Sequence, residues 1–89
     1  MLRAALAVCK PEPFYTEEAR RNQLIGTVVL TAVLASSGKV TNIDVVKGMK
    51  YGLTERAVDA ARKLKFIPAL KDGKFASQHI RLEYNFNLY

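Results

Sequence analysis

Apolar and polar residues alternate most regularly at the end of the chain, over HIRLEYNFNLY, residues 79–89. A period of two predicts a strand with one face on a core and the other in solvent. The residues expected to face the core are Ile80, Leu82, Tyr84, Phe86 and Leu88. The residues expected to face solvent are His79, Arg81, Glu83, Asn85 and Asn87.

Two earlier runs predict a β-hairpin. Residues 27–35, TVVLTAVLA, follow Gly26 and are apolar or β-branched in both alternating sets, which is typical of a central strand. Residues 40–47 form the expected returning strand. The intervening SSGK contains Gly38, which readily adopts the positive φ of a tight turn.

Capping residues and spacing predict two helices. Thr16 is the expected N-cap of a short helix that ends near Gln23, with acids in its first turn and arginines in its last. Thr54 is the expected N-cap of a second helix, with Leu53 just before it. The second helix has a narrow apolar stripe at i, i+4 and i+7, formed by Ala57, Ala61 and Leu64.

The stretch KFIPALKDGK, residues 65–74, must return the chain to the sheet after the second helix. Pro68 prevents further helix because it lacks an N–H and clashes with the preceding turn. We expect Phe66 to turn inward over the end of the sheet. Asp72 and Gly73 are expected to form a tight turn.

The resulting order, α-β-β-α-β, predicts an α+β fold. We expect a small two-layer domain over residues 10–89, with a three-stranded antiparallel sheet and two helices packed on one face. The hairpin's first strand is expected in the centre, and a right-handed crossover places the last strand beside it, at an edge. Residues 1–9 are expected to be an N-terminal tail or a short edge segment.

Candidate chemistry is sparse. The chain has one histidine, His79, and one cysteine, Cys9, so it lacks the residues for a His/Cys metal site or a Cys–His pair. Its glycines are isolated turn residues, not a phosphate-binding loop. We therefore expect no enzymatic activity, catalytic residue, metal or cofactor. Val8 also argues against lipidation of Cys9, and no run approaches the ~20 apolar residues of a membrane helix.

The net charge of +6 suits an acidic partner, but basic residues occur singly or in pairs, without interleaved aromatics. The more specific feature is the predicted edge strand, whose unpaired backbone groups can bind an extended peptide or a second copy. Arg81 and Glu83 guard this edge only weakly.

A set of spaced residues carries a family resemblance. They are Pro13, Tyr15, Ala19-Arg20, Gly26-Thr27-Val28, residues 38–43 (GKVTNI), Leu53-Thr54, Ala57, Phe66, Pro68-Ala69 and Gly73. Together, across residues 10–88, they resemble the C-terminal domain of TonB-family energy transducers. Gly26, Gly38, Phe66, Pro68 and Gly73 would be the structural positions of this motif.

The resemblance implies a periplasmic domain of a protein anchored to the inner membrane. Such a domain would bind the TonB-box peptide of an outer-membrane active transporter as an added strand, and would transmit force from an inner-membrane proton-driven motor. The implied contact strand is Arg81, Leu82, Glu83, Tyr84, Asn85, Phe86 and Asn87. The implied second surface is the segment before the first helix, with Lys10, Glu12, Pro13 and Tyr15.

Two alternatives remain open at this point. A basic nucleic-acid-binding module would need aromatics on its basic face, whereas Tyr84 and Phe86 are expected in the core, so no nucleic acid is expected as partner. A self-associating, strand-swapped dimer would use the same edge as the transporter peptide. A homodimer would therefore not by itself exclude the transport role.

Overall fold

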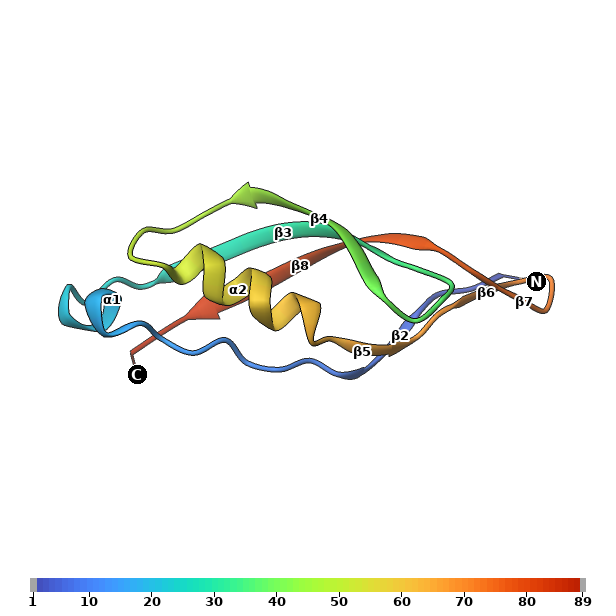
Figure 1. Cartoon of the computed structure of the whole chain (residues 1–89), viewed down its shortest axis with the longest axis horizontal. Coiled ribbons are helices and arrows are strands. Elements are labelled where there is room, and N and C mark those ends of the chain that lie inside the picture. Colours follow the sequence, from blue (N-terminus) through green and yellow to red (C-terminus); the bar gives the residue numbers. More distant parts are fainter. Residues whose placement is uncertain (1, 89) are drawn as a thin grey trace.

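A computed structural model describes residues 2–88, and a three-stranded antiparallel sheet forms the centre of the molecule (Figure 1). Its strands lie in the order β4 (Val40–Lys47), β3 (Gly26–Leu34) and β8 (Gln78–Phe86). The predicted hairpin is therefore correct, with its first strand in the centre. The last strand lies at an edge, as predicted, but it ends at Phe86 and not at the chain terminus.

Strands β3 and β8 pair without interruption, from Gly26 opposite Phe86 to Leu34 opposite Gln78. Opposite residues share a face of the sheet, so the alternating apolar residues of both strands form one buried layer. This layer contains Val28, Leu30, Ala32, Leu34, Leu82, Tyr84 and Phe86, of which the three β8 residues were predicted to face the core. Glu83 and its polar neighbours in β8 are exposed, as their alternation predicted.

Two helices complete the core. α2 (Leu53–Arg62) lies across one face of the sheet and buries Leu53, Ala57, Ala60 and Ala61 (Figure 1). The small alanine side chains allow the helix to approach the sheet closely. α1 (Glu17–Arg21) adds the fully buried Ala19 to the same apolar cluster. The predicted α+β fold with two helices and an antiparallel sheet is confirmed.

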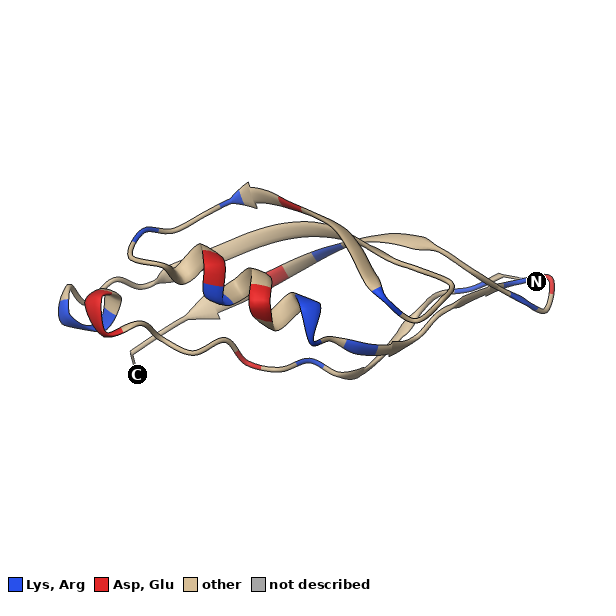
Figure 2. Cartoon of the chain, viewed as in Figure 1, with Lys and Arg blue, Asp and Glu red and all other residues tan. Residues whose placement is uncertain are grey.

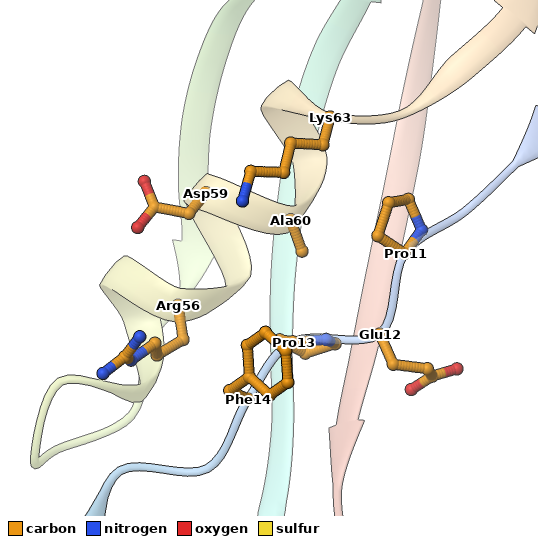
Figure 3. A pocket seen from close by; sticks show the side chains of 8 residues that line it. All are labelled: Pro11, Glu12, Pro13, Phe14, Arg56, Asp59, Ala60 and Lys63. Carbon is orange, nitrogen blue, oxygen red and sulfur yellow. The ribbon is translucent and has the colours of Figure 1, made fainter.

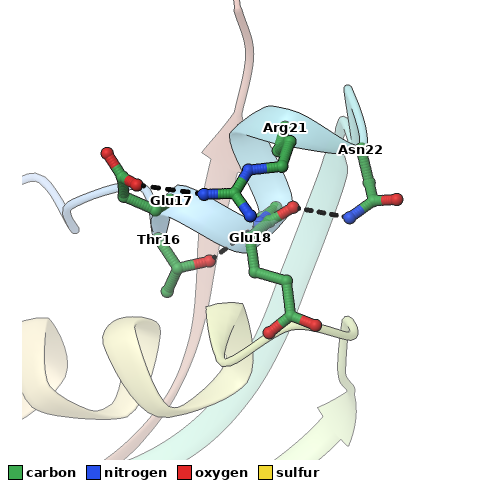
Figure 4. A network of polar contacts seen from close by, with 6 residues as sticks. Thr16, Glu17, Glu18, Arg21 and Asn22 are labelled. Carbon is green, nitrogen blue, oxygen red and sulfur yellow. Dashed lines mark hydrogen bonds and ion pairs between the residues drawn. The ribbon is translucent and has the colours of Figure 1, made fainter.

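Thr16 caps α1 as predicted, because its hydroxyl oxygen accepts the Ala19 N–H at 3.1 Å (Figure 4). The predicted end at Gln23 was two residues too late. The Asn22 side-chain amide donates to the Glu18 carbonyl at 2.8 Å, and Gln23 has a φ of 53°. A positive φ lies outside the helical region, so α1 ends at Arg21.

The predicted N-cap of α2 was wrong. Gly52 is the cap, with a φ of 79°, and Leu53 is the first residue of the helix. The Thr54 hydroxyl serves the preceding loop: it accepts the Met49 N–H at 2.7 Å and donates to the Met49 carbonyl at 2.8 Å. Because Leu53 is itself helical, it is not the residue before a cap.

After α2, the chain forms three short strands that the sequence did not predict: β5 (Lys65–Ile67), β6 (Ala69–Lys71) and β7 (Lys74–Ala76). Phe66 is buried, as expected, and Pro68 separates β5 from β6. Asp72 and Gly73 link β6 to β7, with φ values of 52° and 79°. Two consecutive positive φ angles are what a type I′ hairpin turn requires, so the predicted turn is correct.

The N-terminal residues pair with these strands. β1 (Leu2–Arg3) pairs with β6 and β2 (Leu6–Cys9) pairs with β5, and both pairings are antiparallel. Residues 2–9 thus form two short strands of a ribbon that extends from one end of the domain (Figure 1). Met1 and Tyr89, the outer limits of the two predicted segments, lie outside the described residues.

Candidate peptide-binding edge

Strand β8 has a free edge. In the described part of the chain it pairs with β3 alone, and its other side ends the sheet. The Glu83 carbonyl points to this outer side, because it accepts the Lys10 Nζ at 3.1 Å. Backbone groups alternate in direction along an antiparallel strand, so the groups of Arg81 and Asn85 point outward too. These outward groups provide a regular ladder for an added strand.

The opposite edge of the sheet is a poorer template. β4 shifts register against β3 twice, between Val29 and Leu30 and between Thr31 and Val33. Asn42 lies at the second shift and has a φ of 51°. Bulges of this kind interrupt the spacing of backbone groups and protect an edge from pairing. β8 is therefore the edge better suited to strand addition.

The side chains beside the outward groups of β8 are polar and exposed. Arg81 Nε lies 3.4 Å from Glu83 Oε1, and both side chains are more than half exposed, so water and salt weaken the pair. The Thr27 hydroxyl donates to Asn85 Oδ1 across the strands at 2.6 Å. These side-chain contacts do not use the outward backbone groups of β8.

The segment before α1, residues 10–15, lies close to β8 (Figure 1). The Lys10 ammonium contacts Glu83 and also lies 4.8 Å from the Tyr84 ring centroid. At the other end, the Tyr15 hydroxyl donates to the Leu24 carbonyl at 2.6 Å. The two surfaces that the sequence predicted for partner binding are thus adjacent in space.

A small hollow of about 100 Å³ separates this segment from the outer face of α2 (Figure 3). Phe14 lines it and is 76% exposed, unlike its neighbour Tyr15. Arg56 and Lys63 of α2 also line the hollow, and Asp59 between them pairs with Arg62 at 3.6 Å. This hollow is too small for a peptide.

Tyr84 is the buried polar residue of this region. Its side chain belongs to the core, and its hydroxyl has no hydrogen-bond partner among residues 2–88. Burial raises the pKa of the phenol, and the nearby negative charge of Glu12 adds to the rise. The hydroxyl therefore stays protonated at neutral pH.

Charge is spread over the whole molecule (Figure 2). Within residues 2–88 no group of three or more His, Cys, Asp or Glu residues is placed to hold a metal ion. No helix in that range is long and apolar enough to cross a membrane.

The sequence-predicted contact residues fall into two classes. Arg81, Glu83 and Asn85 present both backbone and side chain at the surface. The side chains of Leu82, Tyr84 and Phe86 are buried, so they offer a partner almost no surface to contact. Asn87 follows the end of β8. In the preceding segment, Lys10 and Glu12 are exposed, whereas Pro13 and Tyr15 are half-buried.

Comparison with known proteins identifies the family. The model of the Gram-negative bacterial TonB protein C-terminal family matches residues 11–88. The chain belongs to this family. It is 36% identical over 77 residues to Protein TonB of Xanthomonas campestris pv. campestris strain B100, and equally to that of strain ATCC 33913. The matched region is 85% of this chain but 34% of each relative, so the chain spans about one third of their length.

The fold is also found in a solved structure. The solution NMR structure of the Pseudomonas aeruginosa TonB CTD superimposes with a TM-score of 0.74. The match covers 94% of this chain and 86% of that one, at 20% sequence identity. At this level of identity the similarity establishes the fold, and the binding role must be argued from the edge strand.

Proposed function

We propose that this domain is a periplasmic energy-transducing adaptor. Its β8 edge binds the TonB-box of an outer-membrane active transporter as an added strand. Force from an inner-membrane proton-driven motor then reaches the transporter through the domain. The observation that carries the proposal is the regular edge strand β8, with outward backbone groups at Arg81, Glu83 and Asn85.

Strand addition fits this task physically. Backbone hydrogen bonds make little demand on the partner's sequence, so one domain is able to serve several transporters. Each bond contributes about 0.5–1.5 kcal/mol net, and several in a row give affinity without large buried surfaces. β8 is itself held to the central strand along its full length, so a pull on it is distributed into the core.

Membership in the TonB C-terminal family supports the transport role. We infer that the domain acts on the periplasmic side and that the full-length protein is anchored in the inner membrane. The net charge of +6 favours approach to acidic periplasmic surfaces by weak steering. We propose a binding role without enzymatic activity, because the described residues of the β8 edge offer backbone groups and exposed polar side chains.

The two alternatives predict different surfaces. A nucleic-acid-binding module needs exposed aromatics for stacking, and β8 offers none, because Tyr84 and Phe86 are each 3% exposed. Its stacking residues would have to lie on other parts of the chain, where Phe14 and Phe75 are exposed. Self-association uses the same β8 edge and therefore competes with the transporter peptide.

The test is an amide NMR titration of the ¹⁵N-labelled domain with a synthetic TonB-box peptide, with a scrambled peptide as control. The proposal predicts shifts concentrated on residues 81–87 and 10–15. If these amides do not move at millimolar peptide while a short oligonucleotide shifts the basic residues, the transport role is wrong. If neither ligand shifts any amide and sedimentation gives a dimeric mass, the β8 edge would be assigned to a second copy of the chain.

A further inference from the structure

Residues Lys10–Tyr15, called the strap here, run beside β8 in the same direction as that strand. Lys10 at the start of the strap contacts Glu83 and Tyr84, and Tyr15 at its end contacts Phe86. Just before the strap, the Gln78 side chain accepts the Ala5 N–H at 2.8 Å. The N-terminal chain thus follows β8 along its whole length.

The strap does not pair with β8 as a strand. No backbone–backbone hydrogen bond joins the two among residues 2–88. Pro11 and Pro13 explain why, because proline has no N–H to donate and cannot extend a sheet ladder. The strap therefore lies close to the edge without occupying it.

One side chain of the strap does engage an outward group. The Lys10 Nζ donates to the Glu83 carbonyl at 3.1 Å, the group that an incoming strand would use as an acceptor. Its position 4.8 Å from the centroid of the Tyr84 ring adds a cation–π contact that holds the ammonium in place. A partner N–H and the Lys10 ammonium cannot both take the same acceptor direction at full strength.

We propose that Lys10 is a releasable guard of the β8 edge. It occupies the Glu83 carbonyl in the free domain and must be displaced when a strand adds. The guard lowers the affinity of the β8 edge for every strand that pairs with it, so that an unrelated peptide or a second copy of the chain does not bind there stably. This inference rests on the proposed function for the identity of the physiological strand, but the guard itself acts on any added strand.

The experiment compares Lys10→Met with the unaltered chain. Methionine keeps the length and the packing over Tyr84 but removes the cation and its donors. Lys39→Met is the matched control, because it removes the same charge from an exposed turn that lies between β3 and β4. Lys10→Arg is the second control, because it keeps both the charge and donors.

Two quantities are measured for each chain: the Kd for the TonB-box peptide by calorimetry, and the dimer Kd by sedimentation equilibrium. Lys10→Met is expected to tighten pairing by about two- to fivefold, the size expected for losing one exposed competing hydrogen bond. Lys39→Met is expected to stay within about twofold of the unaltered chain. Lys10→Arg keeps a cationic donor and is therefore expected not to tighten pairing as Lys10→Met does.

The two readouts separate the guard from the proposed function. If the unaltered chain does not bind the peptide but Lys10→Met strengthens dimerisation, the role of Lys10 as a guard is supported and the proposed transporter partner is wrong. If Lys10→Met strengthens peptide binding, both the guard role of Lys10 and the proposed peptide partner are supported. If it changes neither quantity relative to Lys39→Met, or weakens binding, the guard is overturned whatever the peptide does.

Discussion

The Tyr15 ring meets the Phe86 ring edge to face, with centroids 5.5 Å apart and planes at 84°. Tyr15 ends the strap before α1, and Phe86 is the last residue of β8. The contact therefore joins residues from opposite ends of the sequence. Since the Tyr15 hydroxyl also bonds to the Leu24 carbonyl, one side chain links the strap, β8 and the chain entering β3.

Replacing Tyr15 by alanine should lower the free energy of unfolding by about 2–4 kcal/mol, through lost aromatic packing and the lost hydrogen bond. Urea denaturation followed by circular dichroism measures the change. Phe14→Ala is the matched control, because the adjacent aromatic is 76% exposed and should cost less than about 0.5 kcal/mol. Equal losses in the two variants would contradict the assigned role of Tyr15.

Tyr84→Phe should be at least as stable as the unaltered chain at pH 7, because it removes a buried hydroxyl that lacks a partner among residues 2–88. The free energy of unfolding of Tyr84→Phe should also fall less at alkaline pH than that of the unaltered chain. Burial, and after it the negative charge of Glu12, raises the pKa of Tyr84 in the folded state. The contribution of this group to the free energy of unfolding is therefore fully present below its unfolded pKa of about 10. That contribution is lost as the pH rises from there through the folded pKa.

Unfolding by urea at pH 7 and at pH 10.5 tests the Tyr84 prediction. Tyr15→Phe is the control at neutral pH, because it removes a hydroxyl that does have a partner and should lose about 0.5–1.5 kcal/mol. A clear loss of stability in Tyr84→Phe at pH 7 would show that its hydroxyl is satisfied in solution.

Thr16→Ala should destabilise the domain by about 1–2 kcal/mol, near the upper end for a helix cap. The hydroxyl not only accepts the Ala19 N–H but also donates to the Tyr51 carbonyl at 2.6 Å, so it links α1 to the loop before α2. Thr16→Ser keeps the oxygen and should lie within about 0.5 kcal/mol of the unaltered chain. If serine and alanine are equally harmful, the methyl group and not the hydrogen bonds would be responsible.

Gly73→Ala should cost about 1 kcal/mol, because residue 73 has a φ of 79° that strains any residue with a Cβ. The added methyl meets no atom within 4 Å, so conformational strain is the sole expected cause. Gly73→Asn is the matched variant, since asparagine tolerates this backbone region, and it should lose less than alanine. Thermal unfolding of both variants ranks the losses, and the reverse order would contradict the turn assignment.

The sequence predicted the central sheet well because its strands carry strong local patterns. The alternation from Ile80 to Phe86 determines which side chains are buried, and no other arrangement of that strand hides its aromatics. The apolar character of residues 27–34 on both faces likewise indicated the central position. These signals lie within single elements, so they can be read without knowing the neighbours.

The missed features depend on distant partners. Residues 65–71 form strands only because they lie opposite residues 2–9, which were expected to be a tail or a short edge segment. Residues 65–71 do not alternate enough to predict a strand by themselves. Thr54 has the residue type of a helix cap, but its hydroxyl bonds to Met49 instead. The Lys10–Glu83 contact joins residues 73 positions apart and leaves no local signal in the sequence.

N-methylation of a TonB-box peptide, one amide at a time with a Kd measured for each, distinguishes strand addition at β8 from other modes of binding. In an added strand, every second N–H points at β8, so the losses of affinity should alternate along the peptide. Methylation at one set of positions should weaken binding by about tenfold or more, and methylation at the intervening positions by less than about twofold. A uniform loss at all positions, or losses that follow the peptide's side chains instead, would contradict pairing at the β8 edge.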